Sequence, residues 1–343
     1  MKIVFFTRLF YPHIGGVEKH VLLLSKELQK KGHEVIVVTE RHNRKIKKYE
    51  QYKGIKIHRI TITRQEKIKK YIIWKWIIKN KKLFLDSDIL HAHDVFFWLL
   101  PIRFLMPRKK VFTTFHGYEG NSIPRFKEKI MHKMAEKFSH RTMCIGGFYK
   151  KWYGTNSEIV TYGAVNSVAT NRDLINNKKI VYIGRLENEA GIDTYIDSIR
   201  LLANYGINLE VFGDGARRSS LERLIKKENL PVKIHGWTLT PEIKISKSKI
   251  VFTSRYLGIL EALAQDKFVI AEYNNDIKKD YLQMTPFSKY ISILKSSEEI
   301  ALQVMKFYKN PKKFDAKIKK GGEWARLQTW EMMSQDYLKL WNL

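Results

Sequence analysis

Residues suited to hold a ligand follow two strand-like runs in the second half of the chain. In IGRL, Gly184 and Arg185 stand at the end of one run. An arginine there can grip a diphosphate through two parallel hydrogen bonds, although a surface salt bridge is an equally simple interpretation. In SRYLGILEALA, residues 254–264, the single acid is Glu261, at the predicted start of a helix. The helix dipole favours a carboxylate there even without a ligand, so these residues indicate a binding site only in combination.

Three more glycine turns lie at predicted strand ends. Gly15 and Gly16 separate the first strand from the first helix, where backbone N–H groups and the helix N-terminus attract an anion. Gly213 in FGDG allows a ligand to approach closely, and HGW ends another run with Gly236 and Trp237, whose ring could border a nucleobase. For each of these, a plain turn into the next element is the alternative.

Histidines and acids mark two further strand ends. His91 and His93 alternate in HAHD, but no cysteine or third ligand stands nearby, so we do not expect a zinc site. Glu119 in HGYEG lies close to His116 and could orient it or contact an acceptor, and Asp94 has the same standing. For both acids, a loop carboxylate without a special role is the alternative.

Strands and helices alternate along the chain, which predicts parallel sheets wrapped by helices. In the first part the strand-like runs are KIVFF, EVIVVTE, KIHRI, DILHAHD, KVFTTFH and RTMCIGG. After a polar segment near residues 165–178 the alternation restarts with KIVYIGRL, LEVFGDG, VKIHGW, KIVFTS and FVIAEY. Two such units facing each other would form a cleft, and open α/β sheets bind ligands beyond the carboxyl ends of their strands.

The composition is that of an ordered protein with a large excess of positive charge. The 343 residues include 63 Lys and Arg, 34 Asp and Glu, and one cysteine, Cys144, which excludes an intramolecular disulfide. We expect neither a signal peptide nor a membrane-spanning helix, because charges interrupt each apolar run. The net charge of +29 predicts attraction to polyanions. No nucleic-acid-binding module is recognisable, so we do not expect nucleic acid as a partner.

Much of this charge lies between Arg41 and Lys82, where only Glu50 and Glu66 oppose it. Within this range KIKKYIIWKWIIKNKKLF, Lys67 to Phe84, mixes lysines with tyrosine, tryptophan and isoleucine. That mixture is typical of an interfacial basic helix with aromatic anchors, which docks on anionic lipid. A core helix with a basic outer face is the alternative.

The order of the motifs resembles the family 4 retaining glycosyltransferases of the GT-B fold, over nearly the whole chain. The motifs are GGVEKH, HAHD, FHGYEG, TYGAV, GRLENEAGID, VFGDG, VKIHGW, LGILEALA and DYLKLW. The resemblance implies an α/β protein with two doubly wound Rossmann-like domains facing a central cleft. It further implies an acceptor-binding domain at residues 1–168, a nucleotide-sugar-binding domain at 169–320, and a C-terminal helix at 321–343 that crosses back to the first domain.

The resemblance also implies roles for single residues. His116 and Arg185 would be catalytic, with Arg185 neutralising the leaving diphosphate, and His93 and Glu119 would face the sugar or acceptor. Glu261 would accept hydrogen bonds from the ribose hydroxyls. The residues implied in donor binding are Gly15, Gly16, Gly184, Arg185, Gly213, Gly236, Trp237, Gly258, Ile259, Leu260 and Glu261. The family transfers sugar with retention of configuration, and we expect no metal and no cofactor, with a UDP- or GDP-sugar as donor substrate.

Two departures from the family pattern bear on activity. Ala190 stands where the family commonly has lysine, and Thr253 where it commonly has a second glutamate, in a shortened YLGILEA loop. Arg217, Arg218 or Lys244 could replace the lysine. We expect a glycan or lipid-linked acceptor of cell-surface synthesis and a cytoplasmic protein, peripheral on the membrane face through Lys67–Phe84. The alternative is a degenerate homologue that binds nucleotide or glycan without catalysis.

Overall fold

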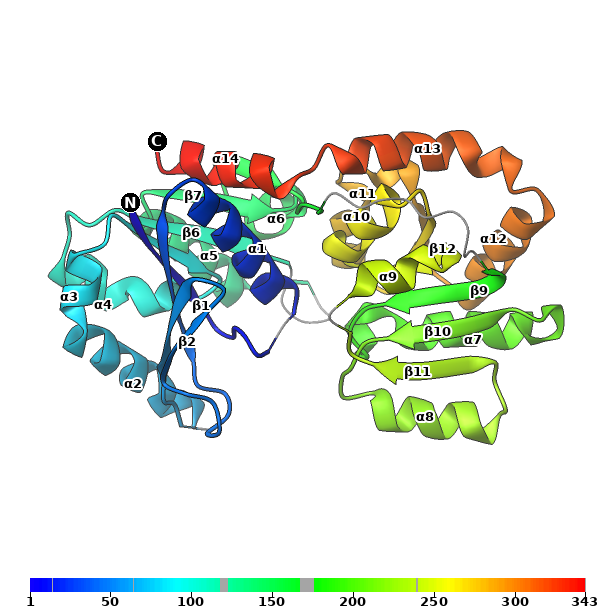
Figure 1. Cartoon of the computed structure of the whole chain (residues 1–343), viewed down its shortest axis with the longest axis horizontal. Helices are drawn as coiled ribbons and strands as arrows, with labels where there is room; N and C mark the ends of the chain where they lie inside the picture. Colours follow the sequence, from blue (N-terminus) through cyan, green and yellow to red (C-terminus); the bar gives the residue numbers. More distant parts are fainter. Residues whose placement is uncertain (14, 64, 118–122, 167–175, 239, 343) are drawn as a thin grey trace. The chain divides into compact units, whose positions relative to one another are not determined.

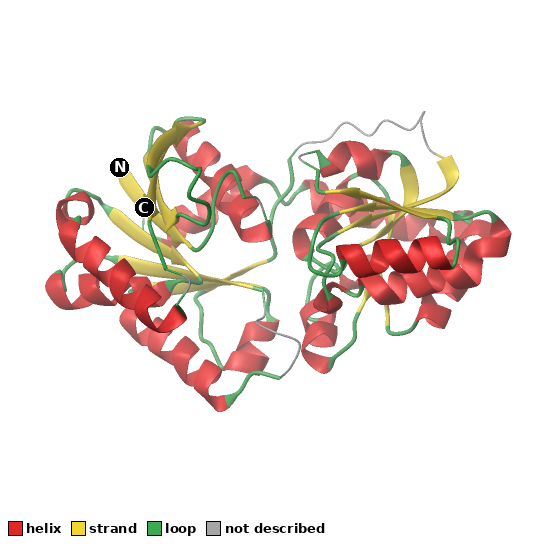
Figure 2. Ribbon diagram, turned by 90° about the horizontal axis from the view of Figure 1, so that it is seen from below, coloured by secondary structure: helices red, strands yellow, loops and turns green. Residues whose placement is uncertain are grey.

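The computed structural model describes residues 1–13, 15–63, 65–117, 123–166, 176–238 and 240–342, which divide into two compact units. Of these residues, the first unit contains 1–117, 124–161 and 330–342, and the second contains those within 162–329 together with Ile123. The division after residue 161 comes earlier than the expected one after 168, because Tyr162 already packs against Tyr256 and Phe287 of the second unit. Each unit is a sheet covered by helices on both faces (Figures 1 and 2).

The first unit is built on an eight-stranded sheet in the order β3-β4-β2-β1-β5-β6-β7-β8. Neighbouring strands are parallel except β3 and β4, which form a hairpin around Lys53 and Gly54, both with positive φ. The central strands are buried on both faces, which is the pattern of a parallel sheet between helices. The strands are β1 (Lys2–Thr7), β2 (Glu34–Glu40), β3 (Tyr49–Tyr52), β4 (Ile55–Ile60), β5 (Ile89–His93), β6 (Val111–His116), β7 (Arg141–Ile145) and β8 (Ile159–Thr161).

Right-handed crossovers distribute the helices of this unit over the two faces of the sheet. The connection through α1 (Gly16–Lys30) steps from β1 toward the β3 edge, whereas the connections through the next helices step toward the β8 edge, so they cover opposite faces. The helices of the second group are α2 (Glu66–Lys79), α3 (Lys81–Leu85), α4 (Leu100–Leu105), α5 (Phe126–Phe138) and α6 (Phe148–Tyr153). A short 3-10 helix, η1 (Phe96–Leu99), precedes α4.

The last helix, α14 (Trp330–Leu340), belongs to the first unit and packs beside α1 (Figure 1). Its buried face presents Trp330, Met333 and Tyr337. The helix before it, α13 (Lys312–Arg326), stays with the second unit. The segment that returns to the first unit therefore starts at Trp330, later than the expected residue 321.

The second unit is built on a six-stranded parallel sheet in the order β11-β10-β9-β12-β13-β14. Its strands are β9 (Asn176–Ile183), β10 (Asn208–Phe212), β11 (Val232–Gly236), β12 (Ser248–Phe252), β13 (Phe268–Glu272) and β14 (Ser292–Leu294). The five strands predicted for this part of the chain are all present. The helices, besides α13, are α7 (Ile192–Leu202), α8 (Arg218–Lys227), α9 (Pro241–Ser246), α10 (Tyr256–Ala264), α11 (Asp276–Gln283) and α12 (Ser297–Lys309).

Among the described residues, the helices are all too short or too polar to cross a membrane.

Candidate active site

The glycine turn after β1 leaves an open N-terminus on α1. The N–H of Gly15 donates to Oε2 of Glu18 at 2.9 Å, and a Cβ on Gly15 would lie 2.6 Å from that oxygen. Around Gly16, by contrast, no atom of the described residues lies within 4 Å of the place a Cβ would take, apart from its chain neighbours and the backbone of its own helix. An anion can therefore approach the first turn of α1 at Gly16, where backbone N–H groups and the helix dipole favour it.

The carboxyl ends of β5 and β6 bring two predicted site residues together. Nδ1 of His93 lies 2.9 Å from Nε2 of His116, and the two strands are neighbours in the sheet. Asp94 fixes the end of β6, because its Oδ1 accepts the backbone N–H of His116 at 2.7 Å. Asp94 thus holds the strand that carries His116. Glu119 lies outside the described residues.

A chain of hydrogen bonds connects α14, and Trp341 just after it, to His20 on α1. The side chain of His20 points toward His93 and His116. Trp341 Nε1 donates to His91 Nδ1 at 3.0 Å, and His91 Nε2 lies 2.7 Å from Thr114 Oγ1. Thr114 Oγ1 lies 3.0 Å from Tyr337 Oη, which lies 2.9 Å from His20 Nε2. The ring of His20 meets that of His116 edge to face, with centroids 4.8 Å apart.

The direction of this chain follows from its first member, because an indole N–H can only donate. His91 must accept at Nδ1, so its hydrogen is on Nε2 and goes to Thr114. Every hydroxyl hydrogen then has a partner if Thr114 donates to Tyr337 and Tyr337 donates to Nε2 of His20. His20 consequently carries its own hydrogen on Nδ1.

Burial keeps this group of histidines neutral. It lowers the pKa of His20 to about 3 and holds the pKa values of His91, His93 and His116 well below the usual 6.5. Neutral imidazoles offer one donor and one acceptor each, which suits the recognition of hydroxyl groups.

Nitrogen atoms of His20, His93 and His116 lie within 4.8 Å of one another, a spacing from which a metal ion could be held. The sequence analysis saw no third ligand beside His91 and His93, because His20 comes from helix α1 and His116 from strand β6. In this arrangement Nε2 of His20 accepts from Tyr337, and the facing nitrogens of His93 and His116 bond each other.

In the second unit, two arginines converge on one glutamate at the carboxyl edge of the sheet. Nη2 of Arg185 lies 2.7 Å from Oε1 of Glu189, and Nη2 of Arg255 lies 3.9 Å from the same oxygen. Arg185 follows β9 and is 61% exposed, whereas Arg255 precedes α10 and is 25% exposed. Sequence reasoning did not single out Arg255, although it stands in the quoted run SRYLG; no periodicity indicates that the chain turns it toward Glu189.

A buried ion pair lies close to these arginines. Nζ of Lys278, on α11, is 2.5 Å from Oε2 of Glu272 at the end of β13, and both side chains are fully buried. Burial lowers the pKa of Lys278 to about 8, and the charges of Arg255 and Glu189 act on it as well. Three cations thus surround two carboxylates, which leaves net positive charge at this edge of the sheet.

The other glycines at this edge are required by close packing. A Cβ on Gly184 would lie 2.6 Å from the Tyr182 hydroxyl, and one on Gly213 would overlap the carbonyl oxygen of Gly184. Gly236 has φ of +82°, and Trp237 after it is 48% exposed, so its indole face is available to a ligand.

The prediction that Glu261 starts a helix was wrong. α10 begins at Tyr256, so Glu261 lies in its second half, where the helix dipole does not favour a carboxylate. Tyr256, Leu257 and Gly258 form the first turn instead of a loop. Ile259 and Leu260 are fully buried, which gives these two predicted donor-binding side chains a core role.

Both departures from the family pattern are buried positions. Ala190 is 3% exposed in a short 3-10 turn, η2 (Asn188–Ala190), and Thr253 is fully buried at the end of β12. The Thr253 hydroxyl has no hydrogen-bond partner in the described part of the chain, and a Cβ on Gly258 would lie 2.5 Å from it. The three residues suggested to replace the lysine have other contacts: Arg217 pairs with Asp193, Arg218 with Asp214 and Glu222, and Lys244 lies over the ring of Phe212.

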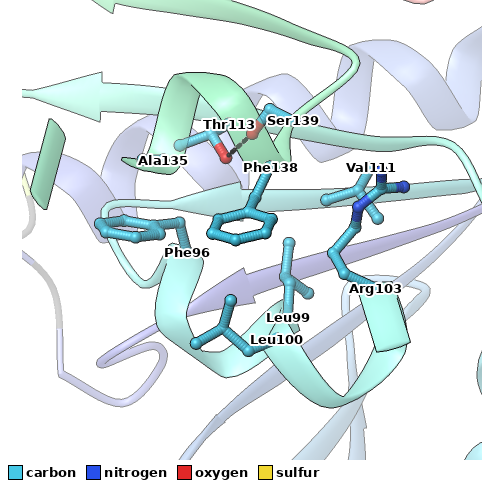
Figure 3. A pocket seen from close by; sticks show the side chains of 9 residues that line it. All are labelled: Phe96, Leu99, Leu100, Arg103, Val111, Thr113, Ala135, Phe138 and Ser139. Carbon is cyan, nitrogen blue, oxygen red and sulfur yellow. Dashed lines mark hydrogen bonds between the residues drawn. The ribbon is translucent and has the colours of Figure 1, made fainter. Parts of the chain in front are cut away.

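A small pocket elsewhere in the first unit is apolar. It lies between α4 and α5, with Phe96, Leu99 and Phe138 around it and Arg103 at its side (Figure 3). The Arg103 guanidinium donates to the carbonyl oxygens of Pro107 and Lys109. The lining has none of the candidate site residues, so this pocket is separate from the candidate active site.

Comparison with known proteins gives a matching family model for each of the two units. The model described as Glycosyltransferase Family 4 matches residues 14–152, and the model described as Glycosyl transferases group 1 matches residues 171–324. An uncharacterised glycosyltransferase of Methanocaldococcus jannaschii is 23% identical over 292 residues, which cover 78% of this chain and 78% of that protein.

Solved structures with the same fold cover nearly the whole chain. Sucrose-phosphate synthase from Thermosynechococcus elongatus superimposes with a TM-score of 0.77 at 15% identity, covering 99% of this chain and 98% of that one. HepE of Anabaena superimposes with a TM-score of 0.73 at 14% identity, covering 99% of each chain. TarM of S. aureus gives a TM-score of 0.73 at 14% identity, with both chains covered fully. The two family models together span most of the sequence, and the chain belongs to the family 4 glycosyltransferases of the GT-B fold.

Proposed function

We propose that this protein transfers a sugar from a nucleotide-sugar donor to a glycan or lipid-linked acceptor, with retention of anomeric configuration. The observation that carries the proposal is the convergence of Arg185 and Arg255 on Glu189. Two guanidinium groups at the carboxyl edge of a parallel sheet form a site for a diphosphate. Arg255 supplies the positive charge of the lysine that the family commonly has at the position of Ala190.

Glu189 competes with the diphosphate while the site is empty. Glu189 and Glu272 carry two negative charges against the three positive charges of Arg185, Arg255 and Lys278, so an incoming diphosphate is attracted by the positive charge that remains. The exposed Arg185 can move onto the phosphate as the bond to the sugar breaks. There it stabilises the negative charge that develops on the leaving group.

Other residues of each unit have further roles. In the second unit, Glu261 accepts hydrogen bonds from the ribose and Trp237 borders the base. In the first unit, the N-terminus of α1 at Gly16 can bind a phosphate, and the imidazole of His116 can bind a sugar hydroxyl. HepE was solved in complex with UDP-glucose and TarM with UDP, which makes a UDP-sugar the first donor to try.

In the transfer step, the bond between the sugar C1 and the phosphate oxygen breaks, and a bond from C1 to the acceptor hydroxyl oxygen forms on the same face. The acceptor proton passes to the leaving phosphate oxygen. This step requires no metal ion, because Arg185 and Arg255 supply the positive charge that a cation would otherwise provide.

The first unit also supports contact with an anionic membrane. On the face covered by α2 to α5, large apolar side chains are exposed next to many lysines: Ile68, Tyr71, Ile78, Leu85, Phe104, Leu105, Phe126, Ile130 and Met134. The tryptophans expected as anchors serve the fold instead, since Trp74 Nε1 donates to Phe97 O at 2.8 Å and Trp76 packs on Phe84. Tyr71, Phe104 and Phe126 replace them as interfacial anchors. A flotation assay with Phe104→Ser and Phe126→Ser tests this; equal binding to anionic and neutral vesicles contradicts it.

The transferase is tested by turnover of UDP-sugars and by calorimetry with UDP. Arg185→Ala should lower turnover by about two orders of magnitude, and Arg255→Ala by about tenfold, while the fold survives. Arg200→Ala is the matched control, since Arg200 also bonds carboxylates but lies on α7. Tight UDP binding without turnover on any acceptor favours the non-catalytic homologue, and unchanged turnover in Arg185→Ala refutes the role of Arg185.

A further inference from the structure

The segment between β2 and β3, residues 41–48, carries five basic residues and is here called the basic loop. They are Arg41, Arg44, Lys45, Lys47 and Lys48. We propose that the basic loop binds anionic groups, carboxylate, phosphate or sulfate, on the acceptor glycan. The proposal rests on the proposed transferase function and names the chemistry of its acceptor.

The basic loop lies at the same edge of the sheet as the candidate site residues of the first unit. It leaves the carboxyl end of β2, which is parallel to β1, and β1 is parallel to β5. The carboxyl ends of these strands therefore share one edge, with Gly16 after β1 and His93 at the end of β5. A ligand at His93 and His116 can extend along this edge toward the loop.

Contacts join the basic loop to the turn that precedes α1. The carbonyl oxygen of Arg8 accepts from the hydroxyl of Thr39 at 3.0 Å. Further along, the rings of Tyr11 and Tyr52 stack at 3.6 Å, and the ring of His13 lies 5.9 Å from that of His42. Thr39 and Tyr52 belong to β2 and β3, which flank the basic loop, and His42 belongs to the loop itself, so the loop lies beside the turn that precedes α1.

Two arginines hold the backbone of the basic loop. Arg41 donates to the carbonyl oxygens of Arg44 and Ile46 at 2.5 and 2.8 Å. Arg59, whose side chain is fully buried, donates to the carbonyl oxygens of Lys47 and Tyr11 at 3.0 and 2.5 Å. A loop held in this way loses less conformational freedom when it binds a ligand.

The charges of the loop are not balanced by neighbouring acids. Glu50 bonds Arg59 at 2.7 Å, and Glu40 bonds Lys69 at 2.8 Å. Glu18 accepts the N–H of Gly15 and lies within ion-pair distance of His13. In the described part of the chain, the exposed side chains of Arg44, Lys45, Lys47 and Lys48 have no ion pair, so their field acts on a ligand.

The ligand is a polar glycan and not a lipid surface. The face of α2 to α5 gathers exposed apolar side chains, but in the basic loop Ile46 is only half-exposed and the remaining side chains are polar. Arginine and lysine without apolar anchors are suited to a hydrated, charged oligosaccharide.

The test measures binding of a heparin tetrasaccharide and of uncharged maltotetraose to the full chain with saturating UDP. The loop variant carries Arg44→Gln, Lys45→Gln, Lys47→Gln and Lys48→Gln. The control variant carries Lys312→Gln, Lys313→Gln, Lys319→Gln and Lys320→Gln, four exposed residues of α13, and removes the same amount of charge. UDP affinity is measured for each chain, so a failure of the donor site is seen separately.

We expect the native chain and the control variant to bind the charged tetrasaccharide at least about tenfold more tightly than the loop variant. UDP affinity should be equal in the three chains. Equal loss in the loop and control variants overturns the proposal, because the attraction would then come from net charge alone. It is overturned also if the loop variant keeps glycan binding but loses flotation with phosphatidylglycerol vesicles, since the basic loop would then serve the membrane.

Discussion

Nδ1 of His93 lies 2.9 Å from Nε2 of His116, and the other nitrogen of His93 is buried without a hydrogen-bond partner among the described residues. One of the two facing nitrogens must donate. If His116 donated, His93 would carry its hydrogen on the buried Nε2, and an unpaired buried N–H is more costly than an unpaired acceptor. His93 therefore donates, and His116 keeps its hydrogen on Nδ1.

His93→Phe removes this donor and should lower kcat by about 5-fold to 100-fold, the effect of leaving one buried acceptor without its partner. His93→Asn should restore part of the activity, because the asparagine amide nitrogen takes nearly the same position as Nδ1. Imidazole nitrogen chemical shifts report the tautomer of His116 in each variant. A Phe variant with native kcat, or a native His116 hydrogen found on Nε2, contradicts the assignment.

The sequence predicted the elements and the strand ends well, because apolar runs and glycine turns are local signals. It placed His93, His116 and Arg185 at carboxyl strand ends, and the sheet order then brings the two histidines together. Contacts between segments that are distant along the chain could not be predicted from the sequence. Tyr337 is separated from His20 by more than three hundred residues, and no local pattern indicates that their side chains meet. The predicted start of α10 at Glu261 was too late for a similar reason. Gly258 is a poor helix former, and the sequence does not show that it fits against Thr253 in the first turn of this helix.

Tyr337 is expected to act through His20. Tyr337→Phe deletes the hydroxyl between Thr114 and His20, so it should lower the free energy of unfolding by about 1–2 kcal/mol and release the tautomer of His20. Tyr308→Phe is the matched control, because the buried hydroxyl of Tyr308 has no partner in the described part of the chain. Urea unfolding measures both. Equal losses would show that the hydrogen bonds of Tyr337 contribute nothing.

Gly258 and Thr253 should behave as a coupled pair. Gly258→Ala places a Cβ 2.5 Å from the Thr253 hydroxyl, and such overpacking costs about 1–3 kcal/mol. Thr253→Ala removes that hydroxyl, which has no hydrogen-bond partner among the residues that the structure describes, so the double variant should recover much of the loss. Gly16→Ala is the control for stability, because among the described residues its Cβ would meet no atom within 4 Å outside its own helix and chain neighbours. Strictly additive losses in the double variant would contradict the contact.

His132 gives the stability of the chain a specific dependence on pH. Burial lowers its pKa to about 4, whereas a histidine in an unfolded chain titrates near 6.5. Between these values the unfolded chain takes up a proton that the folded chain refuses, so stability is lost as the pH falls below about 6.5. From pH 7 to pH 5 the loss is about 1–2 kcal/mol for this residue. The ring centroid of His132 lies 4.7 Å from that of Phe115, 5.6 Å from that of Tyr149 and 4.3 Å from that of Tyr153, so a phenyl ring fits the same place. His132→Phe should thus keep the native stability at pH 7 and lose less at pH 5, whereas the buried histidines of the candidate site keep their share of the pH dependence. Urea unfolding at the two pH values measures the difference, and an equal loss in both chains would place the proton uptake elsewhere.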